Sequence, residues 1–144
     1  MRIGAVFISS VIGGFEQHRQ AAKEAVELMD HKPIMSEYLG ARPYSSGVAC
    51  INEVEQSDIY VLLLGSKYGS ETDEGISVTH AEFRAAQAAN RPILAFVQQC
   101  EMEPKQDAFK EEVEAYRGGV FRASFATTQE LKDQVVRVSI CMLN

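Results

Sequence analysis

The sequence predicts an α/β fold in which five parallel strands form one sheet, in the order 2-1-3-4-5, with helices on both faces. Strand-like and helix-like patterns alternate along the 144 residues, and such alternation favours right-handed crossovers between parallel strands. The apolar run of residues 59–64, bounded by Asp58 and Gly65, is typical of a strand buried on both faces. We therefore place this run at the centre of the sheet.

The first half of the chain supplies two strand–helix units. Residues 2–8 form a strand that runs into a glycine-containing loop, and residues 33–37 form a shorter strand. Between them lies a helix with an apolar stripe at helical spacing, on which Arg19 faces outward or toward the edge of the sheet. A weakly amphipathic helix over residues 48–56 then leads into the central strand.

The second half of the chain continues the alternation. Residues 65–77 form a loop that is long for an α/β connection, which favours a functional, substrate-facing role. Asn90 precedes Pro92 by two residues and supplies a helix stop. The remaining elements are helices over 78–90 and 107–117, strands over 92–98 and 120–125, and a last helix capped by Thr127 and Glu130.

The predicted strand order, which is flavodoxin-like, has a functional consequence. Its first and third strands flank the point where the winding of the sheet reverses, and ligands bind at the carboxyl ends of the strands there. The loops of residues 9–15 and 65–77 then face one crevice. Glu82, near the start of the following helix, lies at the wall of that crevice.

Composition limits the classes of protein to which the chain can belong. The formal net charge is −6, and Lys and Arg form no run, which argues against a general nucleic-acid binder. No apolar run is long enough to cross a bilayer, and the N-terminal segment is typical of a core strand rather than a signal peptide. We expect a cytoplasmic protein, with reduced cysteines, that binds neither nucleic acid nor membrane.

The length of the chain is that of a single domain, residues 1–144. His18 and His80 have no third ligand at metal-binding spacing, so no metal site is expected. The apolar ending, residues 138–144, lacks a polar tail. From this ending we expect the domain to be the N-terminal part of a longer protein.

A set of residues spread over most of the chain carries a family resemblance. It consists of Val6-Phe-Ile-Ser-Ser10, Arg19-Gln-Ala-Ala22, Glu37, Cys50, Ser57-Asp-Ile-Tyr60, Gly65, Tyr68-Gly69, Ser77, Thr79, Glu82 and Arg91-Pro92. This set resembles the DUF4062 domain, a TIR-like module commonly fused to the N-terminus of larger signalling or defence ATPases. The resemblance implies a TIR-like three-layer sandwich, further domains in the same protein, and assembly into a homo-oligomer.

Two more distant similarities concern the same segments. Residues 6–9 resemble the opening strand of TIR domains, and residues 77–82 resemble the segment that bears their catalytic glutamate. Residues 79–92 are similar to the nucleophile region of nucleoside 2-deoxyribosyltransferases. Both relatives cleave N-glycosidic bonds, which implies NAD or a related nucleotide as substrate or ligand and no separate cofactor. The chain differs from the family that it resembles at Gly14 and Phe15, where an acidic residue and Leu are common in that family.

Glu82 is the catalytic residue that this resemblance implies. Cleavage of the bond between ribose C1′ and a base nitrogen passes through an oxocarbenium-like state, which a carboxylate stabilises electrostatically or traps covalently. A nicotinamide leaving group is already cationic and needs no general acid. A structural interpretation is also open, because Thr79-x-x-Glu82 has the spacing of a capping box and the helix dipole favours a glutamate in the first turn.

Residues with uncharged side chains at the predicted crevice are candidates for ligand binding. The hydroxyls of Ser9 and Ser10 could hold a phosphate or a ribose, although serines are also ordinary turn residues. Tyr68 and Gly69 could provide a stacking ring and a close backbone approach to a base. The alternative for this pair is a simple turn that buries an aromatic side chain.

Two charged residues complete the predicted site. Glu37, at the end of the second strand, could bind ribose hydroxyls or be a solvated carboxylate at a strand end. Arg19 could pair with such a carboxylate or with a phosphate, or it could be solvated on the helix surface. The candidate ligand-binding residues are therefore Ser9, Ser10, Arg19, Glu37, Gly65, Tyr68, Gly69, Ser77 and Thr79.

Three functional predictions follow from these residues. The leading one is a TIR-like N-glycosidase that acts on NAD or a related nucleotide, with Glu82 as its carboxylate. The alternative is a non-catalytic module that senses a nucleotide or makes homotypic contacts within a larger signalling protein. The third is a structural interaction domain whose crevice holds no ligand.

Overall fold

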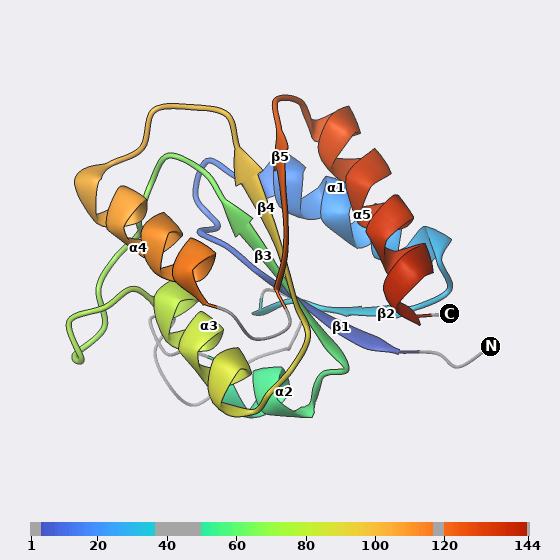
Figure 1. The fold of residues 1–144 in the computed structure, drawn as a ribbon, viewed down its shortest axis with the longest axis horizontal. Coiled ribbons are helices and arrows are strands. Elements are labelled where there is room, and N and C mark those ends of the chain that lie inside the picture. The colour runs from blue at the N-terminus through green and yellow to red at the C-terminus, as the bar shows by residue number, and fades with distance from the viewer. Residues whose placement is uncertain (1–3, 37–49, 117–119, 144) are drawn as a thin grey trace.

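A single sheet of five parallel strands, in the order β2-β1-β3-β4-β5, organises the chain (Figure 1). The computed structural model describes residues 4–36, 50–116 and 120–143. The strands are β1 Ala5–Ser9, β2 Lys32–Ile34, β3 Ile59–Leu64, β4 Ile93–Gln98 and β5 Val120–Phe125. The helices are α1 Glu16–Leu28, α2 Ile51–Gln56, α3 Val78–Ala88, α4 Pro104–Ala115 and α5 Thr128–Leu143. The predicted flavodoxin-like α/β fold is confirmed.

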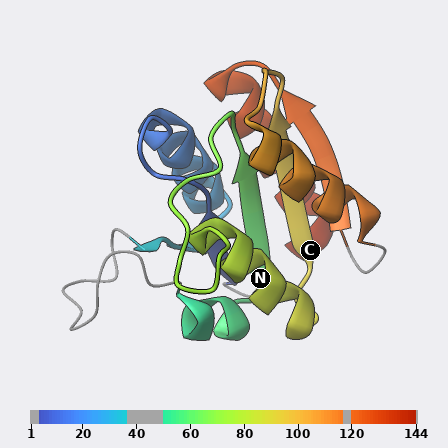
Figure 2. The same cartoon turned by 90° about the vertical axis from the view of Figure 1, so that its left-hand side faces the viewer.

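Helices cover both faces of this sheet. α1 and α5 lie side by side on one face, and α2, α3 and α4 cover the other (Figures 1 and 2). Because successive strand residues point to opposite faces, Val6 and Ile8 of β1 pack under α1 and α5, whereas Phe7 packs under the other three helices. All six residues of β3 are buried, and the prediction that this strand is central is confirmed.

Local signals set the ends of several elements. Thr127 Oγ1 accepts the backbone N–H of Glu130 at 3.1 Å, which confirms the predicted cap of α5. Asn90 has a φ of 56°, the left-handed conformation that commonly follows the end of a helix. The predicted start of α4 at residue 107 is wrong, because Pro104 begins the helix. Proline suits this position, where its missing N–H has no helical partner to lose.

The loops that follow β1 and β3 contact each other. Figure 2 shows the segment 65–77 leaving the end of β3 and running back to the start of α3. A Cβ atom at Gly65 would lie 2.7 Å from Cε1 of Phe15, and one at Gly69 would lie 3.0 Å from Cγ2 of Val11. Larger side chains at these two positions would push the loops apart.

The N-terminal end of α4 holds the loop that follows β3. Glu103 Oε1 accepts the backbone N–H of Tyr68 at 2.8 Å, and the Glu103 N–H donates to the carbonyl of Ser66 at 2.9 Å. The buried Gln106 side chain donates from Nε2 to the carbonyl of Gly65 at 2.9 Å. These bonds order the loop without requiring regular secondary structure in it.

Candidate functional site

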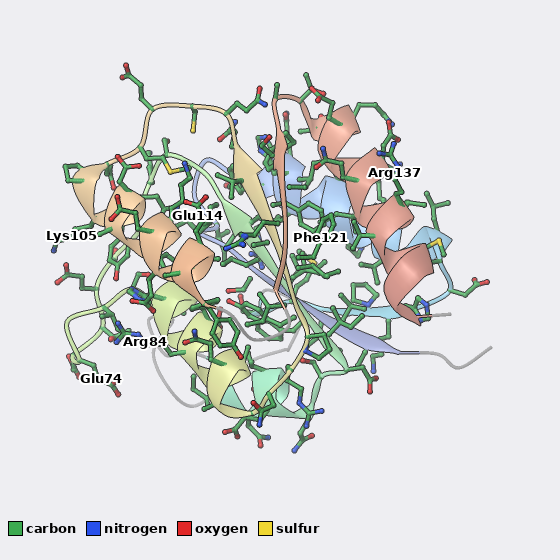
Figure 3. The ribbon with its side chains drawn as sticks, in the orientation of Figure 1. Glu74, Arg84, Lys105, Glu114, Phe121 and Arg137 are labelled. Carbon is green, nitrogen blue, oxygen red and sulfur yellow. The ribbon has the colours of Figure 1, made fainter. Side chains whose placement is uncertain are left out.

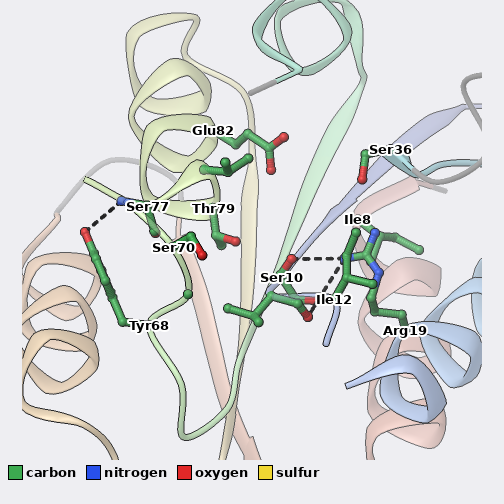
Figure 4. A pocket seen from close by; sticks show the side chains of 13 residues that line it. Ile8, Ser10, Ile12, Arg19, Ser36, Tyr68, Ser70, Ser77, Thr79 and Glu82 are labelled. Atoms are coloured by element: carbon green, nitrogen blue, oxygen red, sulfur yellow. Dashed lines mark hydrogen bonds between the residues drawn. The ribbon is translucent and has the colours of Figure 1, made fainter. Parts of the chain in front are cut away.

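A cavity of about 300 Å³ lies at the carboxyl ends of β1 and β3 (Figure 4). Its position is that of the crevice predicted from the strand order. The predicted site residues that line it are Ser10, Arg19, Tyr68, Gly69, Ser77, Thr79 and Glu82. The other lining residues are Ile8, Val11, Ile12, Ser36, Ser70 and Val78.

Glu82 is a buried and oriented carboxylate at the wall of this cavity. The residue is only 4% exposed. Its Oε1 accepts a hydrogen bond from Oγ of Ser9 at 2.7 Å, and its Oε2 accepts one from the backbone N–H of Cys50 at 3.1 Å. Burial raises the pKa of Glu82, and the two hydrogen bonds and the charge of Arg19 offset only part of that rise.

The start of α3 shows that the capping-box interpretation of Glu82 is wrong. Ser77 is the N-cap residue, and its Oγ accepts the backbone N–H of His80 at 3.1 Å. Thr79 is therefore inside the helix rather than its cap. Glu82 lies beyond the first turn and bonds to Ser9 and Cys50 from other segments instead.

Arg19 lies on the α1 side of the cavity, while Glu82 lies on the α3 side (Figure 4). Its Nη1 donates to Oγ of Ser10 at 2.8 Å and to the Ser10 carbonyl at 3.3 Å. Arg19 is 2% exposed, so the solvated alternative for this side chain is wrong. Its spacing of three from Ala22 and seven from Val26, both buried, places it on the inner face of α1.

Tyr68 reaches the cavity as part of the hydrophobic core rather than as a free ring. It is 6% exposed, and its ring meets those of His80 and Phe109 edge-on at centroid distances of 5.8 and 6.2 Å. Its hydroxyl accepts the backbone N–H of Ser77 at 3.1 Å (Figure 4). These contacts match the predicted alternative of a turn that buries an aromatic side chain.

Two other predicted residues, Ser9 and Gly65, lie apart from the cavity lining. Ser9 is buried, and its hydroxyl donates to Glu82. Gly65 borders a smaller cavity of about 150 Å³, which shares Val11 with the main one. Glu37 is outside the described residues. Gly69 does line the main cavity, but its close backbone approach is to the side chain of Val11.

Sequence reasoning missed the apolar rim of the site and one backbone donor. Val11 and Ile12 line the cavity, and Ile12 is 41% exposed. An apolar pair in the loop after a strand was the available signal, because exposed apolar groups beside polar ones often mark contact sites. Cys50 contributes its backbone N–H to Glu82, and no side-chain pattern predicts a backbone contact.

The described part of the chain contains neither a cluster of metal ligands nor a helix suited to crossing a membrane. Within it, no group of three His, Cys, Asp or Glu side chains is placed to hold a metal ion. None of its helices combines the length and the apolar character that crossing a bilayer requires.

A family match covers most of the chain. The family described as "Domain of unknown function (DUF4062)" matches residues 5–139. The chain belongs to the DUF4062 family. No curated protein matches this DUF4062 domain in sequence.

Two solved structures resemble the DUF4062 domain in fold. One is a CMP N-glycosidase, BcmB, from Clostridium botulinum, with 12% identity and a TM-score of 0.57, covering 91% of this chain and 97% of that one. The other is a flavodoxin from the domain Archaea, with 14% identity and a TM-score of 0.52, covering 99% of this chain and 100% of that one. At these identities the likeness concerns the fold, which hosts unrelated functions.

Proposed function

We propose that this DUF4062 domain is an N-glycosidase that cleaves the bond between the base and the ribose of a nucleotide. The observation that carries the proposal is the Glu82 carboxylate, which is buried, held by two hydrogen bonds and placed at the cavity wall. The fold-level likeness to a CMP N-glycosidase supports the same reaction class. NAD and CMP are the two substrates to test first.

The proposed role of Glu82 is to stabilise the positive charge that develops on the ribose. The bond from C1′ to the base nitrogen breaks, its electron pair leaves with the base, and water adds to C1′ while its released proton goes to the base or to solvent. A carboxylate beside C1′ stabilises the oxocarbenium-like state or bonds to it transiently. The interaction is strong at this site because Glu82 is shielded from water.

The rest of the cavity suits a nucleotide of modest size. Its volume of about 300 Å³ is at the lower end of the range for small-molecule sites, which favours a mononucleotide or one half of NAD. The guanidinium of Arg19 lines the side away from Glu82 and suits a phosphate. Ser36, Ser70 and Thr79 also line the cavity, and their hydroxyls suit ribose.

The test is to incubate the protein with CMP, NAD, NADP and the corresponding nucleosides and to separate released base by chromatography. We expect release from at least one nucleotide and none when Glu82→Gln is used. Nucleosides are expected to react more slowly because they lack the phosphate. Absence of release from every nucleotide by the wild-type protein would overturn the proposal.

A nucleotide-sensing or homotypic interaction module is the second candidate. The observation that favours it is that both Glu82 oxygens already accept hydrogen bonds from the protein, as in a purely structural carboxylate. Isothermal calorimetry separates the two candidates, since a sensor binds CMP or NAD without consuming it. Because a site completed between protomers would need self-association, light scattering should accompany the turnover assay over a concentration series.

A further inference from the structure

A chain of contacts runs from the cavity wall to the outer surface of α4. The Tyr68 hydroxyl lies 2.6 Å from Nδ1 of His80, and Nε2 of His80 lies 3.0 Å from Oε1 of Glu112. Arg84 ends the chain at the surface, where its Nη2 donates to the same oxygen at 2.9 Å (Figure 3). The buried His80 ring stacks on Phe109 with a centroid distance of 4.1 Å.

The hydrogen-bond partners favour one arrangement of the protons along these contacts. The Tyr68 oxygen accepts the backbone N–H of Ser77, so its own O–H is left to donate to Nδ1 of His80. His80 is then neutral, with its proton on Nε2, from which it donates to Glu112. Burial lowers the pKa of His80, and although Glu112 raises it, the net shift is downward, in agreement with a neutral ring.

The same contacts fix the beginning of α3. Tyr68 holds the backbone N–H of Ser77, the N-cap residue, while the hydroxyl of Ser77 accepts the backbone N–H of His80. The first turn of the helix is thereby tied to the loop before it and, through Glu112, to α4. Thr79 and Glu82 extend from this helix to the cavity.

We propose that Tyr68, His80 and Glu112 are positioning residues for the cavity, which hold α3 so that Thr79 and Glu82 face the ligand. The inference rests on the proposed function for its activity measurements. The positioning itself is measured independently through the backbone N–H of Ser77, which depends on the Tyr68 hydroxyl as acceptor.

Protonation of His80 would reverse one bond in this chain. Nδ1 would become a donor toward the Tyr68 oxygen, which already accepts from Ser77 and would have to turn its own hydrogen away. Among the described residues, the titratable or charged groups recorded around the ring are Tyr68 from the loop, Glu112 from α4 and Arg84 from α3 itself. Glu112 favours the protonated ring, and Arg84 opposes it.

Two substitutions of His80 separate its two bonds. In His80→Asn, the side-chain oxygen takes the place of Nδ1 and can accept from Tyr68 at every pH. In His80→Gln, the terminal amide takes the place of Nε2 and keeps only the bond to Glu112. We expect His80→Asn to keep the Ser77 amide protected from exchange at the pH values at which His80 of the wild-type protein is protonated, which lie below the ordinary histidine pKa of 6.5, whereas His80→Gln exposes it.

The decisive variant is Tyr68→Phe, with Tyr116→Phe on the same layer as the matched control. We expect Tyr68→Phe to speed hydrogen exchange at Ser77 and to lower kcat by roughly tenfold to a hundredfold, as small displacements of reacting groups do, while the control changes neither. The inference would be overturned if Tyr68→Phe showed the same hydrogen exchange at Ser77 and the same kcat as the Tyr116→Phe control. If the wild-type protein releases no base, exchange at Ser77 alone decides.

Discussion

The hydroxyl of Ser9 donates a 2.7 Å hydrogen bond to Glu82, across 73 positions of sequence. It joins the last residue of β1 to α3 at the edge of the sheet where the cavity lies. The second oxygen of Glu82 is held by the backbone of Cys50, directly before α2. Three separate segments of the chain therefore determine where this one carboxylate points.

Replacement of Glu82 by Gln is expected to abolish base release while the fold persists. The amide oxygen can still accept the N–H of Cys50, and the amide nitrogen can donate to the oxygen of Ser9, so the free energy of unfolding should change by less than about 1 kcal/mol. The negative charge is lost, so turnover should fall by orders of magnitude. Thermal unfolding and chromatography on one preparation measure both. Glu111→Gln, an exposed position on α4, is the control, and near wild-type turnover in Glu82→Gln would refute a catalytic role.

Replacement of Ser9 by Ala is expected to change stability in a pH-dependent way. The Ser9 hydrogen bond lowers the pKa of Glu82 against the effect of burial, so its removal raises that pKa further. A carboxyl group whose pKa is raised on folding stabilises the native state below the unfolded pKa, and this contribution is lost as pH rises through the folded pKa. Ser9→Ala should therefore be about 1.5–3 kcal/mol less stable near neutral pH, with a smaller loss toward pH 4.

Ser57→Ala is the matched control for that experiment. Ser57 is equally buried, but its hydroxyl donates to the carbonyl of Val54 at 2.7 Å rather than to a carboxylate. Its loss of stability should be the same at every pH. Chemical unfolding from about pH 4 to pH 8 measures both variants, and parallel curves would contradict the role given to Ser9.

Replacement of Gly69 by Ala is expected to cost more stability than the same change at Gly75. Both glycines have positive φ values, 89° and 83°, so each alanine pays about 1 kcal/mol or more of backbone strain. Only at Gly69 would the new Cβ also crowd Val11, since Gly75 has open space. Urea unfolding gives the two stabilities, and calorimetry with CMP or NAD should show weaker binding for Gly69→Ala alone. Equal effects at both sites would show that the loop contact is unimportant.

Replacement of Tyr60 by Phe is expected to stabilise the protein. Tyr60 is fully buried in β3, and its hydroxyl, although close to the Ser9 hydroxyl and the Glu82 carboxylate, makes no hydrogen bond of normal geometry with the described part of the chain. Removal of an unsatisfied buried hydroxyl should raise the free energy of unfolding by about 1 kcal/mol. Chemical unfolding at neutral pH provides the measurement. A loss of stability instead would show that the hydroxyl has a partner.

The fold was predictable because each central strand is a local pattern with clear ends. The apolar run 59–64 is bounded by Asp58 and Gly65, and its limits agree with those of β3. The predicted start of α4 differs from the observed one because the first turn is polar and only Pro104 marks it. Local signals of this kind are strong where apolar runs are long and weak at polar helix ends.

For the candidate site, the sequence predicted which segments lie together but not which atoms contact each other. The strand order brings the loops after β1 and β3 together, which placed Glu82 and Thr79 at the cavity. The bond from Ser9 to Glu82 depends on distances between packed layers, which periodicity does not contain. The helical spacing of Arg19 from buried residues favours its burial, whereas its charge favours a solvated position, and the structure shows that the spacing is the better guide.

Glu82 is held in place by Ser9 and Cys50, so the ligand-binding cavity forms only late in folding, once these long-range hydrogen bonds are made. Those partners lie 73 and 32 positions away in sequence. A partly folded chain in which they do not yet contact Glu82 therefore lacks a complete ligand-binding cavity. A ligand of this site should bind the native state and not its precursors, which slows unfolding and leaves the rate of folding unchanged. The fraction of domains with bound ligand would then determine the rate at which a protease cleaves the domain.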